Sequence, residues 1–116
     1  MEKSIVQIYT GKGKGKTTAA FGVAFRAAGH GMKTLVIQFL KHKETGEKKA
    51  AEEIEEIAVE QYGSSDFIVD GKTDEEDRKE ALKGLKRAER AVMEEDWDIV
   101  ILDELNLVLY YDLLEI

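Results

Sequence analysis

The sequence predicts an α/β domain of three layers, in which helices cover both faces of a mainly parallel sheet. Short apolar runs rich in β-branched residues, typical of strands buried on both faces, recur at residues 5–9, 35–40 and 99–102. Segments with helical spacing of apolar residues separate them, and this alternation favours βαβ units. At 116 residues the chain is expected to form a single domain, residues 1–116.

The composition is that of a globular protein rather than a disordered or membrane-spanning one. Hydrophobic residues make up 43% and charged residues 35% of the chain. There is no cysteine, which excludes disulfides, thiolate metal sites and a cysteine nucleophile. A net charge of −7 argues against broad binding to nucleic acid or anionic membranes. No apolar stretch approaches the ~20 residues of a membrane span, and no signal-peptide pattern opens the chain, so we expect a cytoplasmic protein.

An alternation of glycine and lysine, closed by two threonines, follows the first predicted strand. Its members are Gly11, Lys12, Gly13, Lys14, Gly15, Lys16, Thr17 and Thr18. The glycines allow a tight turn that points successive N–H groups inward, and the helix that follows adds the positive end of its dipole. The Lys16 ammonium can reach phosphate oxygens, and the Thr17 hydroxyl can hold a magnesium ion. The loop therefore predicts a phosphate-binding site of the Walker A kind, suited to a compact polyanion such as a triphosphate.

The loop departs from the usual Walker A pattern, G-x-x-x-x-G-K-[ST], in one respect. That pattern requires glycine at position 10, where this chain has Thr10, so the loop is one residue short. A shorter loop is expected to hold a polyphosphate differently. The alternative interpretation is a flexible basic linker, but the strand pattern before the loop and the helix pattern after it favour the phosphate site.

Residues 16–28 are predicted to form a largely buried helix. Apolar side chains recur at one-turn spacing, at Phe21, Ala24, Phe25 and Ala28. Gly29 is expected to end this helix as its left-handed cap. A second buried strand lies within residues 33–40, so that strand, loop, helix and strand form one βαβ unit.

A shorter helix and an edge strand are predicted next. Thr45 is placed to cap a helix over residues 47–57 with an apolar face, formed by Ala50, Ile54 and Ile57. Residues 58–62 are less apolar and are expected to form a strand near the sheet edge. In the loop that follows, Phe67 and its two apolar neighbours either pack back onto the core or form part of a lid over an apolar ligand.

The longest predicted helix begins at a capping box, residues 73–76. Its expected apolar stripe consists of Leu82, Leu85, Ala88, Val92 and Met93. Charges of both signs alternate on the remaining faces, which indicates a solvated surface rather than a binding patch. The helix is expected to end at residues 96–98.

Two carboxylates, Asp103 and Glu104, close the apolar strand at residues 99–102 in the manner of a Walker B motif. In a P-loop NTPase-like fold this places the acids at the carboxyl end of a strand in the same sheet as the phosphate loop, where they can bind magnesium or its water. We therefore predict that Thr17, Asp103 and Glu104 hold the metal. The apolar ending at residues 105–116, after only four predicted strands, favours a C-terminally truncated chain or one completed by a partner subunit.

Four stretches together resemble one family, the P-loop corrinoid adenosyltransferases. They are residues 9–22, 26–31, 36–41 and 100–106. In order and spacing they cover nearly the whole chain. The shortened loop with three Gly–Lys pairs is the most specific of them, because ordinary kinases and GTPases keep the longer form.

The resemblance implies transfer of the 5′-deoxyadenosyl group of ATP to the Co(I) of a corrinoid, with triphosphate leaving, as in cobalamin biosynthesis or salvage. It implies catalytic roles for Lys16 and Glu104, a position near the nucleoside for Arg26, and contact with the corrinoid for Phe67. Reduced cobalt is itself a strong nucleophile, so the protein has to orient C5′ and stabilise the departing triphosphate. The resemblance further implies Mg²⁺ or Mn²⁺, a homodimer, and an electron donor such as a flavodoxin.

Two other functions remain open from the sequence. The chain could be another P-loop ATPase or kinase, although the short loop and the lack of an evident positioned base or arginine finger argue against it. It could also be a remnant that binds nucleotide, or an assembly partner, without activity. A GTPase is less favoured, because Asn106 is the only asparagine and an Asn-Lys-x-Asp guanine-reading element cannot exist.

Overall fold

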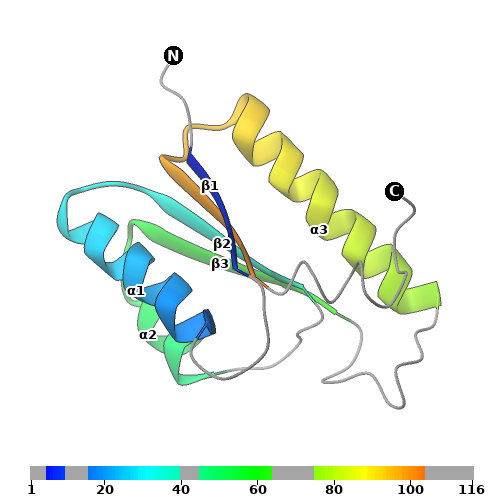
Figure 1. The fold of residues 1–116 in the computed structure, drawn as a ribbon, viewed down its shortest axis with the longest axis horizontal. Coiled ribbons are helices and arrows are strands. Elements are labelled where there is room, and N and C mark those ends of the chain that lie inside the picture. The colour runs from blue at the N-terminus through cyan, green and yellow to red at the C-terminus, as the bar shows by residue number, and fades with distance from the viewer. Residues whose placement is uncertain (1–4, 10–15, 40–44, 64–74, 104–116) are drawn as a thin grey trace.

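The computed structural model describes residues 5–9, 16–39, 45–63 and 75–103 (Figure 1). In chain order the elements are β1 (Ile5–Tyr9), α1 (Lys16–Gly29), β2 (Thr34–Phe39), α2 (Gly46–Glu52), β3 (Ile57–Tyr62), α3 (Glu75–Glu94) and β4 (Ile99–Asp103). The strands form one sheet of order β1-β4-β2-β3 in which every pairing is parallel. Helices α1 and α2 lie on one face and α3 on the other (Figure 1). The predicted three-layer α/β architecture is confirmed and is compatible with a P-loop fold.

Strand β4 lies between β1 and β2, and this order decides what meets at the carboxyl edge of the sheet. Asp103, the last residue of β4, pairs in register with Tyr9 at the end of β1 and with Gln38 near the end of β2. Strands β1 and β4 therefore end side by side. Asp103 thus ends a strand of the same parallel sheet as β1, as the sequence predicts, and the strand order adds that the two strands are neighbours.

Alternate residues of the strands point to opposite faces and build two separate cores. Leu35 and Ile37 of β2 pack toward α3, while Val36 packs toward α1 and α2. All six residues of β2 are buried, which explains its nearly continuous apolar sequence. Strand β3 lies at the sheet edge, as predicted, and beyond Ile57 its residues are only half-buried.

Helix α1 ends with a glycine cap, but the capping residue is not the predicted one. Gly29 is the last helical residue, and Gly31 adopts the left-handed conformation with φ 74°. The Met32 N–H donates to the Ala27 carbonyl at 3.0 Å and the Gly31 N–H donates to the Ala28 carbonyl at 2.9 Å. These two bonds are the pair expected of a Schellman motif, which satisfies carbonyls at the helix end.

Thr45 caps α2 as predicted, since its Oγ1 accepts a 3.2 Å hydrogen bond from the Lys48 N–H. The expected length of that helix, residues 47–57, is wrong. Helix α2 ends at Glu52, and Ile57 begins β3. The expected apolar face is also wrong at Ala50, which is exposed. A turn before β3 lets Ile57 join the sheet, where it is buried against the α1 side.

The apolar stripe of α3 is predicted correctly in its centre and wrongly at its ends. Leu85, Ala88 and Val92 pack on the core beneath the helix. Leu82 and Met93, in contrast, are 45% and 67% exposed. The buried stripe is completed by small residues, at Ala81, Gly84, Ala88 and Ala91. Small side chains let the helix approach the sheet closely. Helix α3 ends at Glu94, earlier than the expected end at residues 96–98.

Several predictions fall outside the described residues. They concern the structure of the glycine–lysine loop, the loop containing Phe67, the capping box and the apolar segment from residue 105 onward. Within the described part of the chain, no helix has the length and apolar character needed to cross a membrane.

Candidate nucleotide-binding site

The first turn of α1 and the end of β4 meet at one hydrogen bond. Thr17 Oγ1 donates to Asp103 Oδ2 over 2.9 Å, and the carboxyl group of Asp103 is fully buried. Lys16 is the first residue of α1, so the N-terminal end of this helix, with its positive dipole, lies at the same edge of the sheet. The structure thus brings Thr17 and Asp103 together, at a position suited to an anion with its counter-cation.

Two glutamines extend this contact across the sheet. Gln38 Nε2 donates to Asp103 Oδ2 at 3.3 Å, and Gln61 Nε2 donates to Gln38 Oε1 at 3.0 Å. No sequence motif predicts a role for either glutamine. Their positions in the sequence could have indicated a role at the site. Gln38 and Gln61 each stand one residue before the end of a strand, and the strand of Gln38 is otherwise almost wholly apolar.

Of the remaining predicted site residues, the structure describes the surroundings of two, Thr18 and Arg26. Thr18 is exposed, next to Thr17 on α1. Arg26 is exposed in the last turn of α1, nine residues beyond Thr17, which corresponds to about 14 Å of helix rise. The structure therefore does not bring the backbone of Arg26 to the Thr17–Asp103 contact. The other predicted site residues lie outside the described ranges: Gly11, Lys12, Gly13, Lys14, Gly15, Phe67 and Glu104.

A hydroxyl and a carboxylate in contact fit the chemistry of Mg²⁺. This ion prefers oxygen ligands, and it usually takes one or two from the protein while waters and substrate phosphates supply the rest. Thr17 and Asp103 offer such oxygens at the helix end where a polyphosphate would bind. Among the described residues, no three His, Cys, Asp or Glu side chains gather into a cluster that could hold a metal alone.

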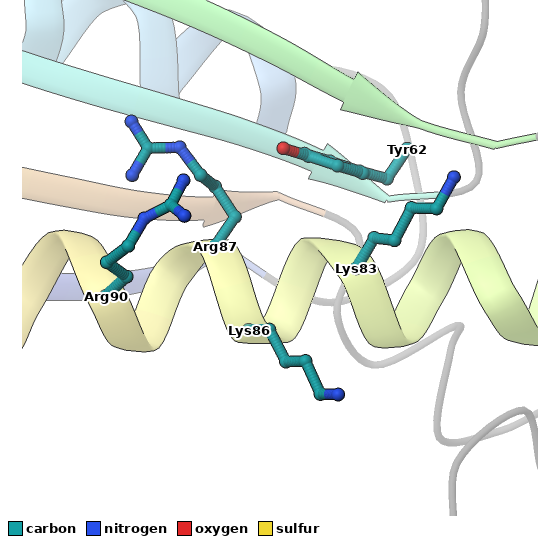
Figure 2. A pocket seen from close by; sticks show the side chains of 5 residues that line it. All are labelled: Tyr62, Lys83, Lys86, Arg87 and Arg90. Carbon is teal, nitrogen blue, oxygen red and sulfur yellow. The ribbon is translucent and has the colours of Figure 1, made fainter.

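A pocket of about 300 Å³ lies on the opposite face of the sheet, between α3 and β3 (Figure 2). It is lined by Tyr62, Lys83, Lys86, Arg87 and Arg90. Figure 2 shows the guanidinium groups of Arg87 and Arg90 on the same side of the helix, while Lys86 points away from Tyr62. Arg87 bridges two carboxylates, with Nε 3.0 Å from Glu60 Oε1 and Nη1 2.9 Å from Glu95 Oε1.

These ion pairs shift the pKa values of the groups that form them. Burial by itself lowers the pKa of Arg87, but hydrogen bonds and attraction from Glu95 and Glu60 outweigh it and raise the pKa. The pKa of Glu95 is lowered, first by a hydrogen bond from Trp97 and then by one from Arg87. The prediction that the charged residues of α3 form a solvated face is therefore wrong for Arg87, whose side chain is only 14% exposed.

Burial also raises the pKa of Tyr62 to about 12, and the hydrogen bond that its hydroxyl donates to Glu60 over 2.6 Å adds to the shift. Tyr62, Glu60 and Arg87 thus form one network that fastens α3 to the edge strand. The network lies on the other face of the sheet from Thr17 and Asp103.

Comparison with known proteins places the chain in a family. The family model described as ATP:corrinoid adenosyltransferase BtuR/CobO/CobP matches residues 2–116. A corrinoid adenosyltransferase of Escherichia coli (strain K12) is 40% identical over 115 residues, which are 97% of this chain and 57% of that protein. The corrinoid adenosyltransferase CobA of Salmonella typhimurium is 37% identical, with coverage of 97% and 57%.

A corrinoid adenosyltransferase of Sinorhizobium sp is 35% identical over 117 residues, which are 99% of this chain and 55% of that protein. The chain thus spans little more than half the length of these curated relatives. The match nevertheless extends over nearly all of its own residues. The chain therefore belongs to the ATP:corrinoid adenosyltransferase BtuR/CobO/CobP family.

Proposed function

We propose that this protein is an ATP:corrinoid adenosyltransferase, which transfers the 5′-deoxyadenosyl group of ATP to the Co(I) of a corrinoid and releases triphosphate. The observation that carries the proposal is the 2.9 Å hydrogen bond between Thr17 and Asp103, which joins the helix after the glycine–lysine loop to the end of β4. The family match and the names of the relatives support the substrate class. A role in cobalamin biosynthesis or salvage follows from that class.

In this proposal the triphosphate of ATP binds at the N-terminal end of α1. The backbone amides of residues 11–15 and the side chain of Lys16 hold its oxygens, and the helix dipole adds to the attraction. Thr17, Asp103 and Glu104 hold Mg²⁺ or Mn²⁺, which neutralises negative charge on the phosphates.

The transfer itself needs no general base. The cobalt lone pair of the corrinoid forms a bond to C5′ of ATP, the C5′–O bond breaks, and the triphosphate leaves with that electron pair. The protein has to align C5′ with cobalt and stabilise the charge that grows on the leaving oxygen. Lys16, the first residue of α1, is proposed to serve the second task. Arg26 is proposed to act near the nucleoside, and Phe67 to contact the corrinoid.

Three further features belong to the same proposal. The corrinoid has to be reduced to Co(I), so an electron donor such as a flavodoxin is proposed as a partner. A homodimer is proposed as the assembly, and the cytoplasm as the location. Neither a nucleic acid nor a membrane is proposed as a partner, in line with the net charge of −7.

One assay tests the reaction. The 116-residue chain is incubated with ATP, Mg²⁺ and chemically reduced cobalamin, while the absorbance change on Co–C bond formation and the phosphate product are followed. Triphosphate together with the adenosylated corrinoid is the expected result. Orthophosphate or ADP would indicate a different P-loop enzyme, and the lack of any product would contradict the proposed activity of this chain.

A lysine pair controls for the loss of charge in this assay. Lys16→Ala should abolish product formation, because the leaving triphosphate loses the ammonium group that stabilises its growing negative charge. Lys79→Ala removes the same charge from an exposed position on α3, on the other face of the sheet, and should leave the rate unchanged. A Lys16→Ala variant as active as the unmodified protein would contradict the assigned role of the loop.

A further inference from the structure

Three polar side chains form a row across the sheet beside the candidate site. Gln38 of β2 pairs in register with Asp103 of β4 and with Gln61 of β3. Residues opposed in register point to the same face of a sheet. This face is the one that α1 covers, because Val36 and Ile101, two residues before Gln38 and Asp103, pack against α1. The row therefore runs from the Thr17 contact to the edge strand.

The direction of each hydrogen bond in the row follows from the chemistry of its first member. An ionised carboxylate can only accept, so Gln38 has to turn its NH₂ group toward Asp103. The carbonyl oxygen of Gln38 then faces β3, where only a donor can satisfy it. Gln61 supplies that donor at 3.0 Å. The orientation of one amide thus fixes the orientation of the next, independently of how the two amide ends are assigned.

The burial of Gln38 indicates that a glutamine stands at this position because of the hydrogen bonds that its side chain makes. Its side chain is fully buried in a strand that otherwise carries apolar residues and one threonine. Burying an amide costs free energy unless its polar atoms are hydrogen-bonded, and a leucine or methionine would fill a similar volume without that cost. What the glutamine adds at this position is a donor aimed at Asp103, with an acceptor held by Gln61.

We infer that Gln38 and Gln61 are positioning residues, which hold Asp103 in the orientation that receives the Thr17 hydroxyl. Thr17 donates its proton to Asp103, so the lone pairs of its Oγ1 point away from the carboxylate, which is the orientation in which a hydroxyl serves as a cation ligand. Gln38 acts on Asp103 directly, and Gln61 acts through Gln38. The inference rests on the proposed function in so far as it takes a cation–ATP complex as the ligand.

The test measures binding of the Mn²⁺–ATP complex by electron paramagnetic resonance, which reports the metal environment without turnover. Outer partners of metal ligands typically contribute 10- to 100-fold to affinity, so Gln38→Leu is expected to weaken binding by about tenfold. Gln61→Leu is expected to weaken it by a smaller factor. Because Gln61 acts through Gln38, the double variant should bind as Gln38→Leu does, whereas independent contributions would multiply.

Two further variants separate positioning from packing. Gln38→Glu keeps the shape of the side chain and the acceptor for Gln61, but it places a carboxylate against Asp103 and should weaken binding at least as much as Gln38→Leu. Tyr62→Phe changes the neighbouring residue of β3, whose side chain lies on the α3 face, and should leave binding unchanged. Thermal unfolding without ligand shows that each variant is folded.

The outcomes distinguish this inference from the proposed reaction. Unchanged Mn²⁺–ATP affinity in Gln38→Glu and Gln61→Leu, or independent effects in the double variant, would overturn the positioning role even if the protein adenosylates cobalamin. Conversely, if the unmodified protein binds Mn²⁺–ATP and the variants weaken it as expected but no Co–C bond forms, the reaction is overturned and the positioning role stands. Failure of the unmodified chain to bind Mn²⁺–ATP would overturn both.

Discussion

Thr17 and Asp103 lie 86 positions apart in the chain, yet the hydroxyl of one donates a 2.9 Å hydrogen bond to the carboxylate of the other. The contact links the first turn of α1 to the last residue of β4. It depends on the strand order, which places β4 beside β1. Both groups have oxygen atoms that can serve as metal ligands, and they lie beside the N-terminal end of α1. This hydrogen bond is therefore the centre of the candidate site.

The Thr17 hydroxyl can be removed with almost no change of shape. Thr17→Val keeps the β-branch and loses only the oxygen, so α1 should form normally while the cation loses a ligand. Under the proposed function, we expect the rate of adenosylcobalamin formation to fall about tenfold or more, by analogy with the loss of groups around metal sites. Thr17→Ser, which keeps the hydroxyl, should retain most of the rate. Rates measured across a range of Mg²⁺ concentrations check this, and equal rates for the valine and serine variants would contradict it.

Two mid-helix glycines are predicted to respond to alanine with opposite signs. A Cβ on Gly84 of α3 would lie 2.6 Å from Cε1 of Phe39, whose ring is fully buried. Overpacking of this kind costs about 1–3 kcal/mol, more than the gain of up to about 1 kcal/mol in helix propensity. Gly84→Ala should therefore lower the free energy of unfolding by about 1 kcal/mol.

Gly22 of α1 serves as the matched control. A Cβ there would meet nothing within 4 Å, so only the propensity gain remains. Gly22→Ala should raise the free energy of unfolding by about 0.5–1 kcal/mol. Urea unfolding of both variants gives the comparison. A stabilising effect at both positions would mean that Phe39 moves aside easily.

Arg87 and Arg90 lie on the same helix and should differ sharply in their effect on stability. The Arg87 side chain is 14% exposed and bridges Glu60 and Glu95, whereas Arg90 is 59% exposed with one contact of 3.4 Å to Glu95. Removing one partner of a shielded pair leaves carboxylates without their cation. Arg87→Met is expected to cost about 2 kcal/mol, or roughly 8 °C in Tm at about 4 °C per kcal/mol.

Arg90→Met is the control for this comparison, and exposed pairs of its kind contribute less than about 1 kcal/mol. Calorimetry of both variants measures the difference in Tm. Similar values for the two would show that Arg87 is screened by solvent as much as Arg90.

Tyr62 gives the protein a predicted loss of stability at high pH. Its pKa is raised to about 12, so the folded state holds the phenol proton more tightly than the unfolded chain, where the pKa is 10.0. The resulting stability is fully present below pH 10 and is lost as the pH rises from 10 toward 12. The free energy of unfolding of the unmodified protein should fall over this window, and that of Tyr62→Phe should fall less.

The titration of Tyr62 can be followed directly. Phenolate absorbance of the unmodified protein, with its four tyrosines, is compared with that of Tyr62→Phe over the same pH range. The component that the variant lacks should be centred near pH 12. If the component that Tyr62→Phe lacks is instead centred near pH 10, neither burial nor Glu60 affects the pKa of the Tyr62 hydroxyl.

Periodicity predicted the strands more accurately than the helices that cover them. Strands β1, β2, β3 and β4 lie within a residue or so of the predicted ranges. For β2 and β4 the reason is that a strand buried on both faces is apolar along its whole length. Helices α1 and α3 are at the predicted places, but the exposure of Leu82 and Met93 was not predicted. A helix presents several possible apolar stripes, and only its contact with the sheet selects one.

What the sequence by itself determined is the class of fold and the two segments whose ends meet at Thr17 and Asp103. These depend on local spacing and on the rule that parallel strands end at a common edge. The tertiary structure alone decided the row from Asp103 through Gln38 to Gln61, and the burial of Arg87 between two carboxylates. Such contacts depend on strand order and register, which long-range packing sets and local sequence patterns do not specify.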